Sequence, residues 1–303
     1  MRETHAIPGA RFMDPSVLAR IGNLELVSRA VVDGFINGLH KAPYFGASVD
    51  FAEHRGYVPG DDVRRMDWRV WARTDRLYIK EYEAESNMNF SVLLDMSKSM
   101  DYGSGGITKF DYARILGACL TNLVHHQRDR VGFAAFDDDV VEFIPPSAKH
   151  METVLHLMDR LKPGKPGNLK TPLHKLSEHF GRRGIIALIS DFYEDPEAVL
   201  EAVAPLRFRG NDIIVFHILD KSELEFGFAD ASPFEDLETG EQMPVVPEAF
   251  REEYRSLVSA HIEGLRKSFS KVRVDYTMLD TSKPLDHALF YYLSGRSRSM
   301  KSR

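Results

Sequence analysis

From residue 88 onward, the chain alternates two patterns of hydrophobic and polar positions. Short apolar runs bounded by polar residues are typical of buried strands, and apolar residues that recur every three to four positions are typical of helices with one buried face. The first pattern predicts strands at residues 88–94, 130–136, 140–144, 185–189, 212–219 and 272–279. The second predicts helices at about 109–127, 150–161, 172–181, 196–206, 248–270 and 284–293.

Strands that alternate with helices form an open, mostly parallel sheet that is covered by helices on both faces. For residues 88–295 we therefore expect an α/β fold with a doubly wound, mostly parallel sheet of the Rossmann type. Residues 1–87 are predicted to be an N-terminal mixed segment, with a helical pattern at 15–41 and then a strongly charged stretch. The Ser-rich residues 296–303 are predicted to be a basic tail.

An acidic excursion interrupts this pattern at residues 220–247, which carry eight Asp or Glu residues and one lysine, for a net charge of −7. Apolar positions at 224–228, 234–237 and 243–246 suggest short strands that are joined by turns. The segment is either a solvated acidic surface or an acidic docking element, and the sequence leaves both interpretations open.

Oxygen-bearing side chains follow two of the predicted strands. Asp95, Ser97 and Ser99 come directly after the strand at 88–94, and Asp191 follows the strand at 185–189. Ligands of parallel sheets gather at the carboxyl ends of the strands, and Mg²⁺ and Mn²⁺ prefer hard oxygen donors. With Thr171, which follows a glycine-rich loop, these residues predict a metal site with five oxygens and a sixth position for water or for a partner's carboxylate.

Each of these residues also has a structural interpretation. Thr171 precedes a proline, so it could be the N-cap of a helix. Asp191 could cap the helix that begins near Pro196. Ser97 and Ser99 could be turn residues. In that case the chain would be a structural scaffold with a degenerate metal site.

The order Asp-x-Ser-x-Ser, loop threonine and strand-end aspartate resembles the metal-ion-dependent adhesion site of von Willebrand factor A-type domains, over residues 88 to about 294. The resemblance implies a von Willebrand factor A-like fold and an Mg²⁺ or Mn²⁺ site, occupied or empty, that binds acidic side chains of partners. Many such domains have Gly-Thr-Asp at the second metal loop, whereas this chain has Lys170 beside Thr171. A lysine at that position would repel a dication.

A second stretch runs from Arg55 through residues 59–69 and 72–74 to Tyr82. It resembles the signature of the bacterial family called domain of unknown function 58 (DUF58), whose members carry an A-type domain after it. Members are typically encoded beside MoxR-type AAA+ ATPases. The resemblance therefore implies a non-enzymatic adaptor or partner of a MoxR-type ATPase, or of another protein with an acidic ligand.

The signature stretch is rich in charge but balanced, because residues 55–85 hold seven Arg or Lys and seven Asp or Glu. The whole chain carries a net charge of −6, so the basic excess that drives nucleic-acid binding is missing and we expect no nucleic-acid partner. The stretch is either a structural network of ion pairs and aromatic rings or a docking face. The candidate partner-binding residues are Arg64, Arg65, Asp67, Trp68 and Arg69.

The remaining composition points to a cytoplasmic protein. The single cysteine, Cys119, excludes an intrachain disulfide, and no apolar stretch approaches the roughly 18 residues that span a bilayer. The first residues lack the apolar core of a signal peptide. An enzyme is the weaker alternative: Asp95 could resemble the nucleophile of an Mg²⁺-dependent phosphohydrolase, but the second position of that motif is Ser97 and no phosphate-binding lysine loop is visible.

Overall fold

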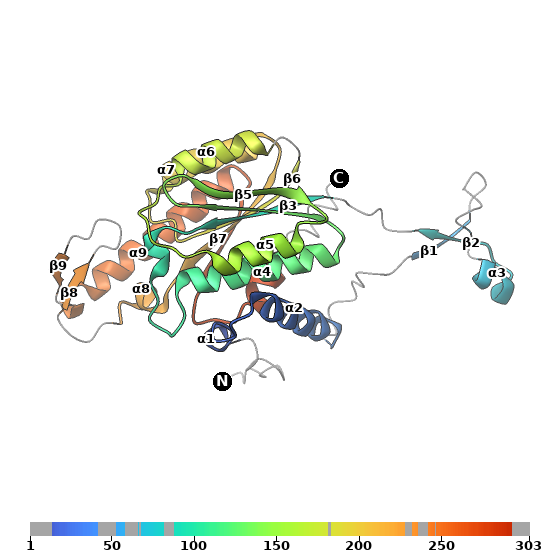
Figure 1. Cartoon of the computed structure of the whole chain (residues 1–303), viewed down its shortest axis with the longest axis horizontal. Helices are drawn as coiled ribbons and strands as arrows, with labels where there is room; N and C mark the ends of the chain where they lie inside the picture. The colour runs from blue at the N-terminus through green and yellow to red at the C-terminus, as the bar shows by residue number, and fades with distance from the viewer. Residues whose placement is uncertain are drawn as a thin grey trace.

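A six-stranded sheet forms the centre of the computed structural model, which describes residues 14–41, 53–57, 66, 68–81, 88–180, 183–227, 232–235, 242–245 and 247–292 (Figure 1). Its strand order is β10-β7-β6-β3-β4-β5. The strands are β3 (Asn89–Asp95), β4 (Arg130–Phe136), β5 (Val140–Ser147), β6 (Gly184–Ser190), β7 (Asp212–Leu219) and β10 (Asp275–Asp280). All neighbours run parallel except β4 and β5, whose short connection permits only an antiparallel hairpin. The predicted mostly parallel α/β class is confirmed.

Helices cover both faces of the sheet (Figure 1). One face packs against α2 (Leu24–Lys41), α4 (Lys109–His126), α5 (Met151–Arg160) and the helical residues 286–292. The other packs against α6 (Lys170–His179), α7 (Pro196–Phe208) and α9 (Pro247–Lys271). Side chains of a strand alternate between faces, so Val92 and Leu94 join the first core while Leu93 joins the second. This accounts for the continuous apolar run of β3.

The N-terminal helices belong to the same core as the sheet. Helix α1 (Pro15–Leu18) and α2 contribute buried apolar side chains to the cluster around α4, among them Leu18, Val27 and Val32. In contrast, β1 (Glu53–Gly56), α3 (Trp68–Thr74) and β2 (Tyr78–Glu81) stand apart from the sheet in Figure 1. The division at residue 88 therefore marks where the sheet begins, while the hydrophobic core includes earlier residues.

The acidic excursion starts with a helix, so the prediction of a strand at 224–228 is wrong. Helix α8 (Lys221–Glu225) follows Asp220, whose side chain and that of Glu223 form a capping box. Phe226 ends the helix in the left-handed region, with φ of 48°. Two antiparallel strands, β8 (Ser232–Glu235) and β9 (Gln242–Val245), agree with the short strands predicted later in the segment. The predicted basic tail at 296–303 lies outside the described residues.

The strand order creates a switch point between β3 and β6. The chain runs outward from β3 to β4 and β5, then crosses to the other side of β3 and continues from β6 to β7 and β10. The carboxyl ends of β3 and β6 are therefore adjacent, at the place where open α/β sheets bind ligands. Within the described part of the chain, no helix combines the length and apolar character that crossing a membrane requires.

Candidate functional site

Asp95, the last residue of β3, is buried at the switch point and bonded on both carboxylate oxygens. Its Oδ1 accepts a hydrogen bond of 2.8 Å from the Ser97 backbone N–H, and its Oδ2 accepts one of 2.6 Å from the Ser190 hydroxyl at the end of β6. Burial, together with the neighbouring charge of Asp191, raises the pKa of Asp95 to about 7. The predicted proximity of the two strand ends is therefore observed.

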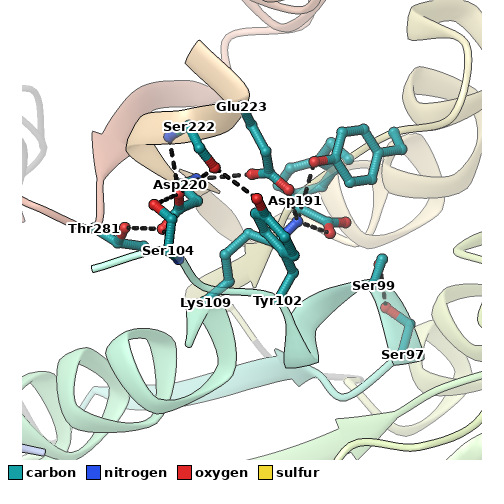
Figure 2. A network of polar contacts seen from close by, with 12 residues as sticks. Ser97, Ser99, Tyr102, Ser104, Lys109, Asp191, Asp220, Ser222, Glu223 and Thr281 are labelled. Carbon is teal, nitrogen blue, oxygen red and sulfur yellow. Dashed lines mark hydrogen bonds and ion pairs between the residues drawn. The ribbon is translucent and has the colours of Figure 1, made fainter. Parts of the chain in front are cut away.

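The hydroxyls of Ser97 and Ser99 lie 3.1 Å apart, and both side chains are buried (Figure 2). They flank the start of a short 3-10 helix at Lys98–Asp101. The loop after α5 packs directly on this turn, because the Lys98 N–H donates to the Lys165 carbonyl over 2.7 Å. A Cβ on Gly167 would lie only 2.6 Å from the Cβ of Ser97, so this close approach requires a glycine.

A buried lysine, which the sequence did not single out, stands at the centre of the site (Figure 2). The Nζ of Lys109 lies 2.8 Å from Asp191 Oδ2, 2.8 Å from Glu223 Oε1 and 3.1 Å from the hydroxyl of Tyr193, and it lies 4.5 Å from the centre of the Tyr193 ring. Burial alone would lower the pKa of Lys109, but Asp191 and Glu223 outweigh it and raise the pKa. Lys109 is therefore a buried cation shared by two carboxylates.

The position of Lys109 at a helix start was a sequence signal that could have singled this lysine out. It is the first residue of α4, and its neighbour Thr108 caps the helix by accepting from the Asp111 N–H. A cation is disfavoured at a helix N-terminus, where the helix dipole is positive. A lysine directly after a good N-cap therefore gains from a nearby carboxylate, although nothing local indicates which one.

Asp220 joins three separate segments beside this lysine (Figure 2). It accepts from the backbone N–H of Ser104 over 3.1 Å, from the N–H of Ser222 over 2.8 Å and from the hydroxyl of Thr281 over 3.0 Å, and it also accepts from the Ser104 hydroxyl. Burial alone would raise the pKa of Asp220, but the bonds from Ser104 and Ser222 outweigh it and lower the pKa. These hydrogen bonds of Asp220 hold α8, and with it Glu223, against the site.

Comparison with known proteins identifies the family. The family model described as a protein of unknown function, DUF58, matches residues 53–264. The chain belongs to the DUF58 family. Uncharacterized proteins of Mycobacterium bovis (Mb1516) and Mycobacterium tuberculosis (Rv1480) are each 28% identical over 257 residues, which cover 82% of this chain and 80% of theirs.

Solved structures similar to this DUF58 chain have low sequence identity. BatB from Bacteroides thetaiotaomicron is 17% identical with a TM-score of 0.48, covering 70% of this chain and 99% of its own. An aerotolerance-related membrane protein from Bacteroides fragilis is 16% identical with a TM-score of 0.48, covering 66% and 96%. The SpRpn10 VWA domain is 12% identical with a TM-score of 0.41, covering 67% and 94%.

Unlike the other predicted metal ligands of this DUF58 chain, Thr171 is exposed. It is the second residue of α6, and its side chain is exposed, whereas Asp95, Ser97, Ser99 and Asp191 are buried. The alternative in which Thr171 is the N-cap is wrong, because α6 begins at Lys170 and the Asn168 side chain accepts from the Thr171 N–H over 3.0 Å.

The donor set fits a hard cation only in part. Asp95 and the two serine hydroxyls provide buried oxygens from one turn, but Asp191 Oδ2 is already paired with Lys109. Among the described residues, no group of three or more His, Cys, Asp and Glu side chains could hold an ion, so serine hydroxyls would have to complete the site. Asp191 and Glu223 share the ammonium of Lys109, and Asp95 adds a third carboxyl group whose pKa the charge of Asp191 raises, so this excess of acidic groups favours a further cation.

The DUF58 signature is described only in part, since residues 58–65, 67 and 82 lie outside the described residues. Arg64, Arg65 and Asp67 are not described, and of Arg69 only the backbone in α3 is described. The indole of Trp68 is 56% exposed and meets Trp71 edge to face, with ring centres 6.1 Å apart. The choice between a structural network and a docking face therefore stays a prediction.

Proposed function

We propose that this DUF58 chain is a non-enzymatic protein-interaction module that binds acidic partners at the carboxyl-end face of its sheet, with the help of Mg²⁺ or Mn²⁺. The observation that carries the proposal is the excess of carboxyl groups over cations around Asp191. The buried Asp95 and Asp191 and the partly buried Glu223 are accompanied by one buried ammonium, that of Lys109. Buried acidic groups in excess are costly unless a proton or a cation compensates them.

In this proposal Asp95, Ser97 and Ser99 would hold the ion, and Asp191 would join them when its carboxylate turns from Lys109. A bound ion supplies an open coordination position that takes a partner's carboxylate. The chain's own groups orient this arrangement: the Ser190 hydroxyl holds one oxygen of Asp95, and the Ser97 N–H holds the other. Asp191 contributes negative charge next to Asp95. Thr171 would have to turn inward to join the set.

The proposed partner is a MoxR-type AAA+ ATPase, which the resemblance to the DUF58 signature suggests. An ATP-consuming partner works where ATP is supplied, so the proposal includes a cytoplasmic location. Co-purification with a MoxR-type ATPase tests this, with wild type, Asp191→Ala and added chelator compared. Loss of binding in the last two conditions is expected. Binding in all three would remove the metal from the interface, and no binding in any would reject the ATPase as partner.

The metal itself is tested by isothermal titration of Mg²⁺ and Mn²⁺ into wild type and Asp95→Ala. Asp101→Ala is the matched control, because Asp101 is exposed in the same 3-10 turn. We expect binding by wild type and the control, and none by Asp95→Ala. Equal binding by all three proteins would place the ion elsewhere.

A structural scaffold with a degenerate metal site is the second candidate. It is favoured by the ion pair that already occupies Asp191 and by the exposure of Thr171. Absence of any heat of metal binding in the same titration would support it. A phosphohydrolase is less favoured, because Ser97 stands where the second carboxylate of that motif would lie. Phosphatase and ATPase assays of the purified chain test that alternative.

A further inference from the structure

We infer that Lys109 is a built-in cation that competes with the divalent ion for Asp191 and thereby sets the metal affinity of the site. The inference rests on the proposed function, because it assumes that the site binds a metal. It assigns a determinant of affinity to a residue that lies outside the Asp-x-Ser-x-Ser turn. The geometry around the lysine carries the argument.

The ammonium of Lys109 is held at the site and cannot be screened by solvent. Its side chain has no exposed surface, and the carboxyl groups of Asp191 and Glu223 bind it at 2.8 Å each. The Asp191 side chain is itself only 5% exposed. Charges that are buried together interact strongly, since water and salt screen them much less than they screen exposed charges. A dication that approaches Asp191 must therefore share this carboxylate with a fixed positive charge.

Glu223 makes this sharing possible because it offers the ammonium a second partner. Its Oε1 binds Lys109, while its Oε2 accepts from the Asp220 N–H over 2.8 Å in the capping box of α8. Tyr102 adds a hydrogen bond of 2.7 Å to Ser222 in the same helix. When Asp191 turns toward an ion, Lys109 keeps the contact with Glu223. The carboxylate on α8 thus positions the lysine and weakens its competition with the metal.

The sequence singled out a different lysine as the one opposing the metal. Lys170 neighbours Thr171, but its side chain is 77% exposed and its Nζ lies 3.6 Å from Glu201, which is 71% exposed. Exposed charges are screened by water and salt. The exposed pair of Lys170 and Glu201 therefore serves as a matched control for the pair of the buried Lys109 and the partly buried Glu223.

The experiment measures Mg²⁺ and Mn²⁺ affinity by isothermal titration for wild type, Lys109→Gln and Lys170→Gln, with circular dichroism to verify folding. Glutamine keeps a hydrogen-bond donor for the carboxylates but removes the charge. We expect Lys109→Gln to bind at least about tenfold more tightly than wild type, and Lys170→Gln to stay within about twofold. We also expect Mg²⁺ to raise the melting temperature of Lys109→Gln more than that of wild type.

The outcomes separate the inference from the proposed function. If wild type and folded Lys109→Gln bind with equal affinity, or if the variant binds more weakly, the inference is overturned while the metal site stands. If neither protein binds a metal, both the metal proposal and the inference fail. If Lys109→Gln does not fold, the metal affinity of Glu223→Gln tests the inference instead. The inference is supported if Glu223→Gln binds the metal at least about threefold more weakly than wild type while the control Glu201→Gln binds as wild type does. It is overturned if Glu223→Gln binds as tightly as wild type or more tightly.

Discussion

Replacing Asp95 by asparagine should make the metal-free protein more stable at neutral and alkaline pH. Asparagine is close in size and carries no titratable proton. Its amide oxygen can accept the bond from the Ser97 N–H, and its amide NH₂ can donate to the Ser190 hydroxyl, which now donates to Asp95. The substitution therefore removes a buried charge and preserves the number of hydrogen bonds to the group.

The magnitude follows from the pKa of Asp95, which burial and Asp191 raise from 3.8 to about 7 in the folded chain. Below pH 3.8 both the folded and the unfolded state hold the proton, so the carboxyl group costs nothing there. As the pH rises to about 7, the unfolded state releases its proton first, and the free energy of unfolding falls. A pKa difference of roughly three units corresponds to at most about 4 kcal/mol of unfolding free energy, and the protein has lost all of this stability once the pH exceeds the folded pKa.

Urea denaturation in chelator between pH 4 and pH 8 measures this effect. The difference in unfolding free energy between Asp95→Asn and wild type cancels the contribution of every group unaffected by the change. We expect this difference to grow with pH in favour of the variant, and the exposed Asp101→Asn to show no such trend. A difference that is independent of pH would refute the assignment of a buried, proton-retaining Asp95. Saturating Mg²⁺ at pH 8 should then stabilise wild type more than the variant.

Three further predictions concern packing and exposure. Gly167→Ala should lower the unfolding free energy by about 1–3 kcal/mol, because the new Cβ would lie 2.6 Å from the Cβ of Ser97. The control Gly164→Ala, whose Cβ would meet open space, should change the unfolding free energy little. Equal urea midpoints of the two variants would contradict this prediction. Thr171→Val should leave Mg²⁺ affinity in titration within about twofold, since its side chain is exposed, and a larger loss would return Thr171 to the site. Cys119 is buried and burial raises the pKa of its thiol, so Ellman's reagent should modify it in urea but not in the native protein.

The sequence alone determined the elements of the sheet and the class of the fold. Strand and helix periodicities report which local positions are buried, and burial in β4 and β7 follows the apolar runs directly. The same reasoning placed Asp95 and Asp191 at strand ends, where parallel strands bring side chains to one edge. These conclusions needed only contacts between neighbours in the chain and a general rule of parallel sheets.

Only the tertiary structure decided what surrounds those aspartates. The adjacency of β3 and β6 is a property of strand order, and the partners of Lys109 lie 82 and 114 residues away in the chain. The exposure of Thr171 could not be inferred from local pattern, since it depends on where distant segments pack. For α8 there was a local signal, the capping box of Asp220 and Glu223, but the apolar positions at 224–228 suggested a strand instead. A charged residue is buried only when tertiary packing brings it compensating charge, and no periodicity records that event.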